Sequence, residues 1–462
     1  MSPKRPINAD VPAPENGEEK PPAEQETRKL PEVEAEAAKP KEKKAKAPKP
    51  AKPRKREPKS PAPKFLLGLV VLALVFIVAA IVGGSGGDEE TAGNPAPAPA
   101  PASNADAEEA PASQAPEALG YPSFATNNTT RIGGSDPASN AAAVALAVFP
   151  STTPEQRPAA VTLVGEEDVA GAIAAAVLMA PPVRAPLLFS TPDELPEASE
   201  EAIAALDPQG GKATQGATLF AVGAVALPDS GMVARVDSGD PASTAAQIAT
   251  LRDQLFGKPP AHFVIAPGSQ PELAAPAAAW AARSGDPVLY AEAKKLPQAT
   301  AAVLEDHPKV PVYVLGPASA ISKAVVEEIE EISKRVSRVA GKGPAANALA
   351  LARYRDGRFG WNVNDPGHGF VLARSDSPAD AVAAAPLSAS GTWGPLLLTD
   401  NAATLPADVR SYFLDVKPGY TTDPTRAFYN HVWVIGDQEA IDVNQQAEVN
   451  ELAELAKIGG GE

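Results

Sequence analysis

One short pattern occurs three times in this chain of 462 residues, at intervals of about a hundred residues. Each copy opens with an arginine that leads into a small loop and an alanine-rich helix. A β-run, a second helix, a proline-led apolar strand and a last strand that ends in glycine follow. The opening arginines are Arg131, Arg235 and Arg338. A repeat of this length is a domain, so the pattern predicts three tandem copies of one fold.

Short apolar strands that begin at a proline mark the middle of each copy. They are Pro186-Leu187-Leu188, Pro287-Val288-Leu289 and Pro395-Leu396-Leu397. Continuously apolar strands that alternate with helices are typical of a parallel sheet covered on both faces. Each copy is therefore predicted to be a doubly wound α/β module. We place the modules at 126–234, 235–337 and 338–447, and a helix end with a tail at 448–462.

Alanine-rich runs at 172–177 and 381–385 contain no polar residue. A helix without a polar stripe is covered on several sides, and small side chains let a neighbour approach closely. These runs favour three modules packed about a pseudo-threefold axis. An alanine-biased genome would produce the same residues.

The first 125 residues differ from the rest in composition. The chain has 51 prolines, and many fall in 1–64 and 85–125 among alanine, glutamate and lysine. Such segments cannot bury enough apolar area to offset the entropy of ordering, so we expect a disordered tail at 1–64 and a disordered linker at 85–125.

Between the tail and the linker, residues 65–84 are apolar and uncharged. As a helix they would span a hydrocarbon core of about 30 Å. We interpret this run as a transmembrane helix. A cleaved signal peptide is the competing interpretation, but a long polar segment precedes the run.

Charge predicts the orientation of that helix. Lysine and arginine crowd residues 39–64, whereas Asp88, Glu89 and Glu90 follow the apolar run. The positive-inside rule then leaves the N-terminus in the cytoplasm and residues 85–462 outside, as a single-pass protein of the cell membrane whose modules lie in the wall. We expect the basic tail to hold this topology and to attract anionic lipid, rather than to bind nucleic acid or a partner protein.

Several kinds of catalytic site are not indicated. The chain has no cysteine, and its four histidines show no metal-ligand spacing. No phosphate-binding loop, Gly-x-Ser-x-Gly or His-Glu-x-x-His motif occurs in the sequence. We therefore expect no enzyme activity, no metal and no cofactor.

The three arginines are candidates for ligand binding. In a threefold assembly Arg131, Arg235 and Arg338 would be related by symmetry and could surround a shared cleft with planar donors for phosphate or carboxylate. The alternative is that each arginine ties down its own loop by bonding to backbone carbonyls or to Asp136 and Asp240. The residues alone do not decide between the two interpretations.

Two further sets of residues have a structural and a binding interpretation. Asp376 and Asp380 are binding candidates, but they lie near a helix start, where a carboxylate more often caps the helix. The proline-led strands are expected to be core, although their carboxyl ends face the crevice where open α/β sheets bind ligands.

The order of these motifs resembles the cell-wall-binding repeat 2 family of bacterial surface proteins. Residues 371–381 of the third module are similar to that family's Leu-Ala-x-Gly-Asp-x-x-x-Asp-Ala turn, and the proline-led strand is present in all three copies. The first copy has Gly171 in place of the second aspartate, and the second copy lacks both carboxylates at 266–273. The resemblance covers about 131–445.

The resemblance implies that three modules form one unit, which attaches non-covalently to anionic polymers of the cell wall. We therefore predict a membrane-anchored, non-catalytic protein that binds a wall glycopolymer. The alternative is an extracytoplasmic scaffold that binds a protein partner in the cell envelope. The chain has a net charge of −16, which would repel an anionic polymer at long range. Binding would then need a local basic patch or bound cations.

Overall fold

The computed structural model describes residues 124–237, 239–390 and 394–458. The predicted tail at 1–64, the predicted membrane helix at 65–84 and nearly all of the predicted linker lie outside the described residues. Within the described part of the chain, no helix is both long and apolar enough to cross a membrane. The described part is a mixed α/β structure built on parallel sheets, as the repeated pattern predicts.

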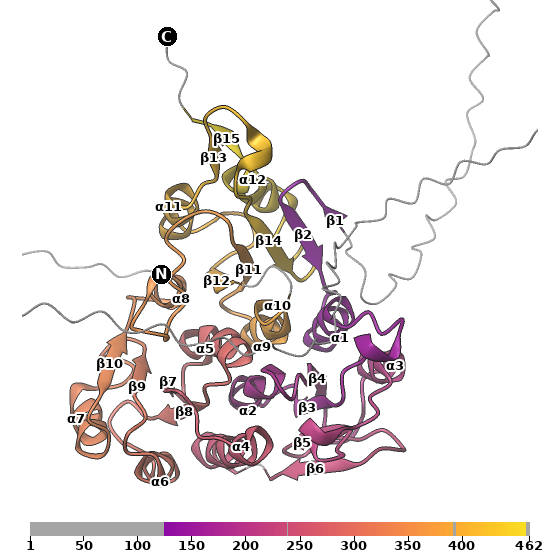
Figure 1. The fold of residues 1–462 in the computed structure, drawn as a ribbon, viewed down its shortest axis with the longest axis vertical. Coiled ribbons are helices and arrows are strands. Elements are labelled where there is room, and N and C mark those ends of the chain that lie inside the picture. Colours follow the sequence, from indigo (N-terminus) through magenta and orange to yellow (C-terminus); the bar gives the residue numbers. More distant parts are fainter. Residues whose placement is uncertain (1–123, 238, 391–393, 459–462) are drawn as a thin grey trace, which may run out of the picture. The chain divides into compact units, whose positions relative to one another are not determined.

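Two of the sheets have the same four-stranded order (Figure 1). The first runs β4-β3-β5-β6, all parallel, with β3 (Val161–Gly165), β4 (Leu187–Ser190), β5 (Leu219–Val222) and β6 (Val233–Val236). The second runs β8-β7-β9-β10, also all parallel, with β7 (Phe263–Pro267), β8 (Val288–Ala291), β9 (Val312–Leu315) and β10 (Val336–Val339). In both sheets the proline-led strand is the edge strand next to the first strand of its module.

The third sheet repeats this order but takes two strands from the beginning of the described residues. Its order is β12-β11-β14-β2-β1, with β11 (Gly369–Arg374), β12 (Leu396–Thr399), β14 (His431–Ile435), β2 (Thr129–Ile132) and β1 (Phe124–Ala125). Strand β2 pairs in parallel with β14, so that Arg131 lies opposite Val434. Strand β2, from the first repeat, therefore extends the C-terminal sheet and closes the three repeats into a ring. Strand β1 pairs with β2 in antiparallel fashion.

Each arginine-bearing strand is the fourth strand of a sheet. Arg235 lies on β6 and Arg338 on β10. We expected these residues to open the second and third modules, but in the structure they complete the sheets of the modules before them. The predicted boundaries at 235 and 338 lie within β6 and β10 and stay predictions. The difference arises because strand pairing is a contact between distant segments, which the order of motifs along the chain does not reveal.

The helices cover both faces of the sheets and connect one sheet to the next. They are α1 (Pro137–Val148), α2 (Val169–Ala175), α3 (Glu197–Leu206), α4 (Pro241–Phe256), α5 (Pro271–Ser284), α6 (Gln298–Asp306), α7 (Lys323–Ile332), α8 (Pro344–Arg353), α9 (Pro378–Ala383), α10 (Ala385–Ser388), α11 (Ala407–Asp415) and α12 (Val443–Ala453). Short 3-10 turns lie at η1 (Pro154–Gln156), η2 (Ala176–Met179), η3 (Lys212–Thr214) and η4 (Pro424–Arg426). The third repeat has an insertion near 418–426, which holds η4 and strand β13 (Gly419–Tyr420); β13 pairs with β15 (Ala456–Lys457).

The alanine-rich helices α2, α5 and α9 contact one another between the three sheets (Figure 1). The helix after each arginine strand packs on the central helix of the sheet that this strand completes: α1 on α9, α4 on α2, and α8 on α5. Those same helices cover the edge strands β4, β8 and β12. The contacts therefore follow a threefold cycle, and small side chains permit the close approach of the central helices.

Candidate functional site

Crevices open at the carboxyl ends of the strands in the first and second sheets. The first has a volume of about 380 Å³ and lies where β3, β4 and β5 end. The second has a volume of about 700 Å³ and lies where β7 and β8 end. Pro241, the first residue of α4, lines both. This is the edge at which open α/β sheets bind ligands.

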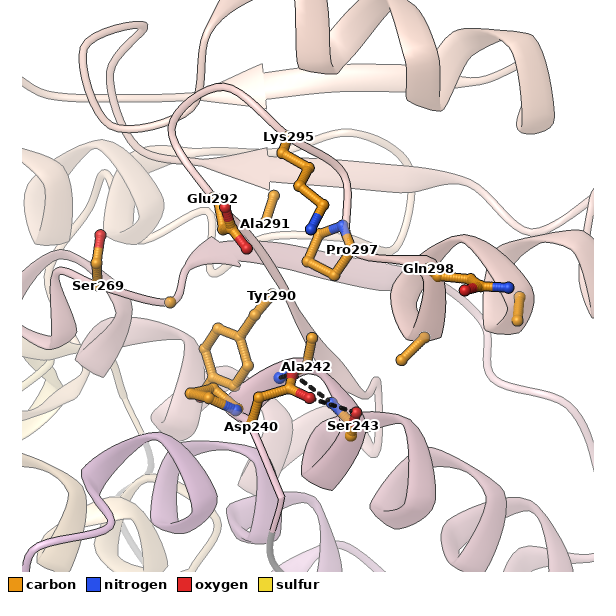
Figure 2. A pocket seen from close by; sticks show the side chains of 14 residues that line it. Asp240, Ala242, Ser243, Ser269, Tyr290, Ala291, Glu292, Lys295, Pro297 and Gln298 are labelled. Carbon is orange, nitrogen blue, oxygen red and sulfur yellow. Dashed lines mark hydrogen bonds between the residues drawn. The ribbon is translucent and has the colours of Figure 1, made fainter.

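The second crevice is formed by two loops and the start of α4. In Figure 2 the side chain of Tyr290 lies between Asp240 and the loop that carries Glu292 and Lys295. The Tyr290 hydroxyl donates a hydrogen bond of 2.6 Å to the carbonyl of Ala170 in α2. Burial raises the pKa of Tyr290 well above its ordinary value. The residue is therefore a neutral tie between the second sheet and the first module.

The start of α4 is already occupied by a carboxylate of the chain itself. Asp240 accepts hydrogen bonds from the backbone of Ala242 and of Ser243, at 3.0 and 3.1 Å, and from the Ser243 hydroxyl at 2.6 Å. The bond from the Ser243 hydroxyl, followed by the backbone bonds, lowers the pKa of Asp240. Asp240 thus stays ionised and satisfies the end of the helix.

The first crevice is acidic. Glu166, Glu167 and Asp168 follow β3 and line it. Burial, with repulsion from Asp136, Glu167 and Asp380, raises the pKa of Glu166. Carboxylates gathered in this way disfavour an anionic ligand in the first crevice.

Gly171 departs from the aspartate that the family resemblance implies, and the structure gives a physical reason. Asp168 caps α2 by accepting a 2.8 Å hydrogen bond from the backbone of Gly171. A Cβ atom at Gly171 would lie 2.3 Å from an oxygen of that carboxylate. The glycine is therefore required by the geometry of this cap.

Arg131 is buried and bound to the loop that follows β14. Its side chain donates to the backbone carbonyls of Gly436, Asp437 and Ile441 and to the side chain of Gln446. The residue is only 2% exposed. Burial lowers its pKa, and Asp437 and Asp442 oppose that shift. Arg131 thus ties the N-terminal strand to the last repeat.

Arg338 makes the corresponding contacts in the second sheet, whereas Arg235 faces solvent. Arg338 donates to the carbonyls of Gly316 and Ile321, at 2.7 and 2.8 Å. Arg235 is exposed on β6. The contacts of Arg131 and Arg338 are those of the loop-tying interpretation, in which the donors are taken up by backbone carbonyls.

Asp376 and Asp380 lie at the start of α9 and bond to the chain itself. Asp376 forms an ion pair with Arg374. Asp380 accepts hydrogen bonds from the Ser377 hydroxyl and, at 2.8 Å, from the Asn140 side chain in α1. The Asp380 carboxylate therefore joins the first repeat to the third.

The proline-led strands are buried along their whole length. Leu188, Leu289 and Leu397 are fully inaccessible to solvent. The crevices begin at the carboxyl ends of these strands, at Ser190 in β4 and at Tyr290 and Ala291 in β8. The sequence pattern therefore located the edge of the crevices but not Glu292 and Lys295, since these loop residues carry no repeated signal, and it did not single out Tyr290 as a residue of the crevice. Among the described residues, no group of three or more acidic or histidine side chains could hold a metal ion.

Comparisons with known proteins agree with this architecture. Residues 235–326 and 338–445 match the model of the family described as cell wall binding domain 2 (CWB2). Two solved structures from Clostridium difficile share the fold, each with a TM-score of 0.53: Cwp6 at 18% identity and Cwp8 at 20%. The alignments cover 71% of this chain but only 48% of Cwp6 and 52% of Cwp8, about half of each. No curated protein matches the chain. The second and third repeats of this chain are therefore similar to the cell wall binding domain 2 family.

Proposed function

We propose that this chain is a membrane-anchored, non-catalytic protein whose three modules attach non-covalently to a wall glycopolymer. The observation that carries the proposal is the match of two tandem repeats to a cell wall binding family, on sheets that close into a threefold cycle. Cwp6 and Cwp8 share the fold of this chain and add support through their architecture alone.

The side chains at the crevices favour binding over catalysis. Asp168 and Asp240 are engaged as helix caps, and the Tyr290 hydroxyl is engaged by a backbone carbonyl. A catalytic acid, base or nucleophile must instead be free to reach substrate. These groups therefore support a rigid surface rather than a reacting centre.

A threefold cycle suits a repeating polymer. When several weak sites lie on one rigid unit, each further contact with the same polymer strand is intramolecular, so the overall affinity rises without any strong single site. Neighbouring repeats are also in direct contact, as at Pro241, which lines crevices of both the first and the second sheet. We propose that a polymer strand engages neighbouring modules of one pseudo-threefold unit.

The location follows from the proposed anchor. The helix at 65–84 would cross the membrane with the N-terminus in the cytoplasm, and the basic tail would contact anionic lipid. The linker at 85–125 could reach on the order of 100 Å if extended, which would carry the modules into the wall.

Sedimentation with purified cell walls tests the proposal. We expect full-length protein to pellet with walls, and to stay in solution when the walls have been stripped of their glycopolymers by acid. The measurement is repeated over a range of salt and of divalent cations, because an acidic protein and an anionic polymer repel each other. Equal retention by intact and stripped walls, or no retention under any of these conditions, would contradict the proposal.

One observation favours the scaffold alternative. Phe428 and Tyr429, which follow the insertion of the third repeat, are 70% and 55% exposed. Exposed aromatic side chains are typical of protein-binding surfaces. Under this alternative, replacing both with serine would abolish retention by the envelope while binding to purified glycopolymer would remain unchanged.

A further inference from the structure

A second kind of cavity lies at the opposite edge of the second sheet. It has a volume of about 450 Å³ and is lined by Lys258, His262, Trp280, Arg283, Asp286, Arg358 and Trp361 among others. His262 directly precedes β7, so the cavity faces the amino ends of the strands. The crevices described above lie at their carboxyl ends. We refer to this cavity as the amino-edge pocket.

The loop between α8 and β11 forms one wall of the amino-edge pocket. Within this loop, Phe359 stacks on Tyr313 of β9 with ring centroids 3.6 Å apart. Trp280 at the end of α5 meets Phe359 and Trp361 edge to face, at 5.0 and 5.5 Å. Trp280 and Trp361 are 5% and 7% exposed. The pocket therefore has a fixed aromatic wall, assembled from the second repeat and from the start of the third.

A buried carboxylate orients the polar part of that wall. Asp286 is 2% exposed and accepts hydrogen bonds from the backbone and the Nδ1 atom of His262, at 3.0 and 2.9 Å. It also accepts a 3.1 Å hydrogen bond from the indole of Trp280. Because the Asp286 carboxylate is hydrogen-bonded to both side chains, it fixes the orientation of the His262 and Trp280 rings that line the pocket.

Three exposed cations complete the lining. They are Lys258, Arg283 and Arg358, from three different segments of the chain. Within the described ranges, neither Lys258 nor Arg358 forms an ion pair with a carboxylate. Arg252 donates to the carbonyls of Lys258 and Gly285 and so holds the loop that carries Lys258. A chain with a net charge of −16 thus concentrates positive charge beside a carbon-rich wall.

We propose that the amino-edge pocket binds a saccharide that carries an anionic group, with the sugar ring against the aromatic wall and the anion between Lys258 and Arg358. Ligand sites commonly combine an aromatic lining with a few placed polar groups, and arginine and lysine are the usual partners of phosphate and carboxylate. The inference deepens the proposed function and rests on it, because an anionic wall polymer is disfavoured by the acidic first crevice and favoured here.

Titration with a small ligand tests the pocket directly. Full-length protein is titrated with glucose 6-phosphate and with glucose, and tryptophan fluorescence is followed, since Trp280 and Trp361 line the pocket. We expect saturable binding of the phosphate and at least about tenfold weaker binding of glucose, because hydrogen bonds to a charged group are each worth a factor of ten or more. No saturable change with glucose 6-phosphate, or equal affinity for both sugars, would overturn the proposal.

A second test replaces two of the cationic side chains that line the pocket. The double variant Lys258→Gln with Arg358→Gln should bind glucose 6-phosphate at least about tenfold more weakly. The control Lys212→Gln with Lys457→Gln removes the same charge from exposed sites in other parts of the fold and should bind like wild type. Both variants replace exposed side chains, so their melting temperatures should stay close to that of wild type. Equal affinity of the pocket variant and wild type would overturn the proposal.

Sedimentation of wild type and both variants with cell walls distinguishes a failure of the pocket inference from a failure of the proposed function. If wild type and the control variant pellet with walls and the pocket variant does not, both proposals are supported. If all three pellet equally, the pocket inference is wrong and the wall function stands. If none pellets, the proposed function is wrong, and the titration still decides whether the pocket takes an anionic sugar.

Discussion

Truncation of Arg131 should destabilise the ring of three repeats far more than truncation of the equivalent arginines. Replacing Arg131 with alanine removes donors from three backbone carbonyls and from Gln446, in a place that is almost fully buried. An unsatisfied buried acceptor costs about 1–3 kcal/mol. Water can enter part of the space left by the long side chain, so we expect a total loss of about 3–5 kcal/mol.

The equivalent substitutions give a graded control. Arg338→Ala removes donors from two carbonyls at a half-buried position and should cost about 1–2 kcal/mol. Arg235→Ala alters an exposed side chain and should change the stability by no more than about 0.5 kcal/mol. Lysine at position 131 keeps the charge but lacks the planar fork, so its effect should fall between wild type and alanine.

Thermal unfolding of the full-length protein, followed by circular dichroism, measures the series. For a folded unit of this size, about 3–5 kcal/mol corresponds to a fall in melting temperature on the order of 5–10 °C. The reasoning is refuted if Arg131→Ala melts within about 1 °C of wild type, or if Arg235→Ala is as destabilising. Weaker binding of wall polymer by all three variants, with unchanged melting temperatures, would instead support the shared-cleft interpretation.

Two further substitutions test the contacts of the first crevice and of the central helices. Because the pKa of Glu166 is raised in the folded protein, its carboxylate destabilises the fold above that pKa and not at low pH. Glu166→Gln should therefore raise the melting temperature at pH 7, and the gain should vanish below about pH 4; a gain independent of pH would contradict the assignment. Asn347 is fully buried, accepts a hydrogen bond from the backbone of Gly341 and donates to the carbonyl of Leu273 in α5. Asn347→Ala should lower the unfolding free energy by about 2–3 kcal/mol in urea titration, and a change below about 0.5 kcal/mol would show that this tie between repeats is unimportant.

The local elements of the fold were predictable from the sequence. The proline-led runs predicted β4, β8 and β12, with errors of one or two residues at their ends, and the expected β-run of each copy lies at β3, β7 and β11. These signals are local, because a buried parallel strand needs apolar side chains on both of its faces. The central helices were recognisable for a related reason: the runs at 172–177 and 381–385 lack any polar side that could face water.

The connections between repeats were not predictable in the same way. The arginine-bearing strands are short and partly polar, and the pairing of β2 with β14 joins the two ends of the folded unit. Nothing in the local pattern distinguishes a strand that opens a repeat from one that completes the sheet of the preceding repeat. The role of Arg131 follows from that pairing, so the sequence left its two interpretations open.

The amino-edge pocket was hidden for another reason. Lys258 and Arg358 lie in corresponding connections of two successive repeats, α4 to β7 and α8 to β11, but these loops differ in length and sequence and share no motif that marks a site. The acidic composition of the whole chain predicted repulsion of an anionic polymer and the need for a local basic patch. The structure brings such a patch together beside Trp280 and Trp361.

The affinity of the full-length protein for purified, soluble wall glycopolymer tests the central claim most directly. Calorimetric titration should give saturable binding to the polymer and none to peptidoglycan fragments that lack it. Binding should tighten as salt is lowered if the pocket cations contact the polymer. Absence of saturable binding at every salt and divalent-cation concentration, with the protein shown to be folded, would contradict the account.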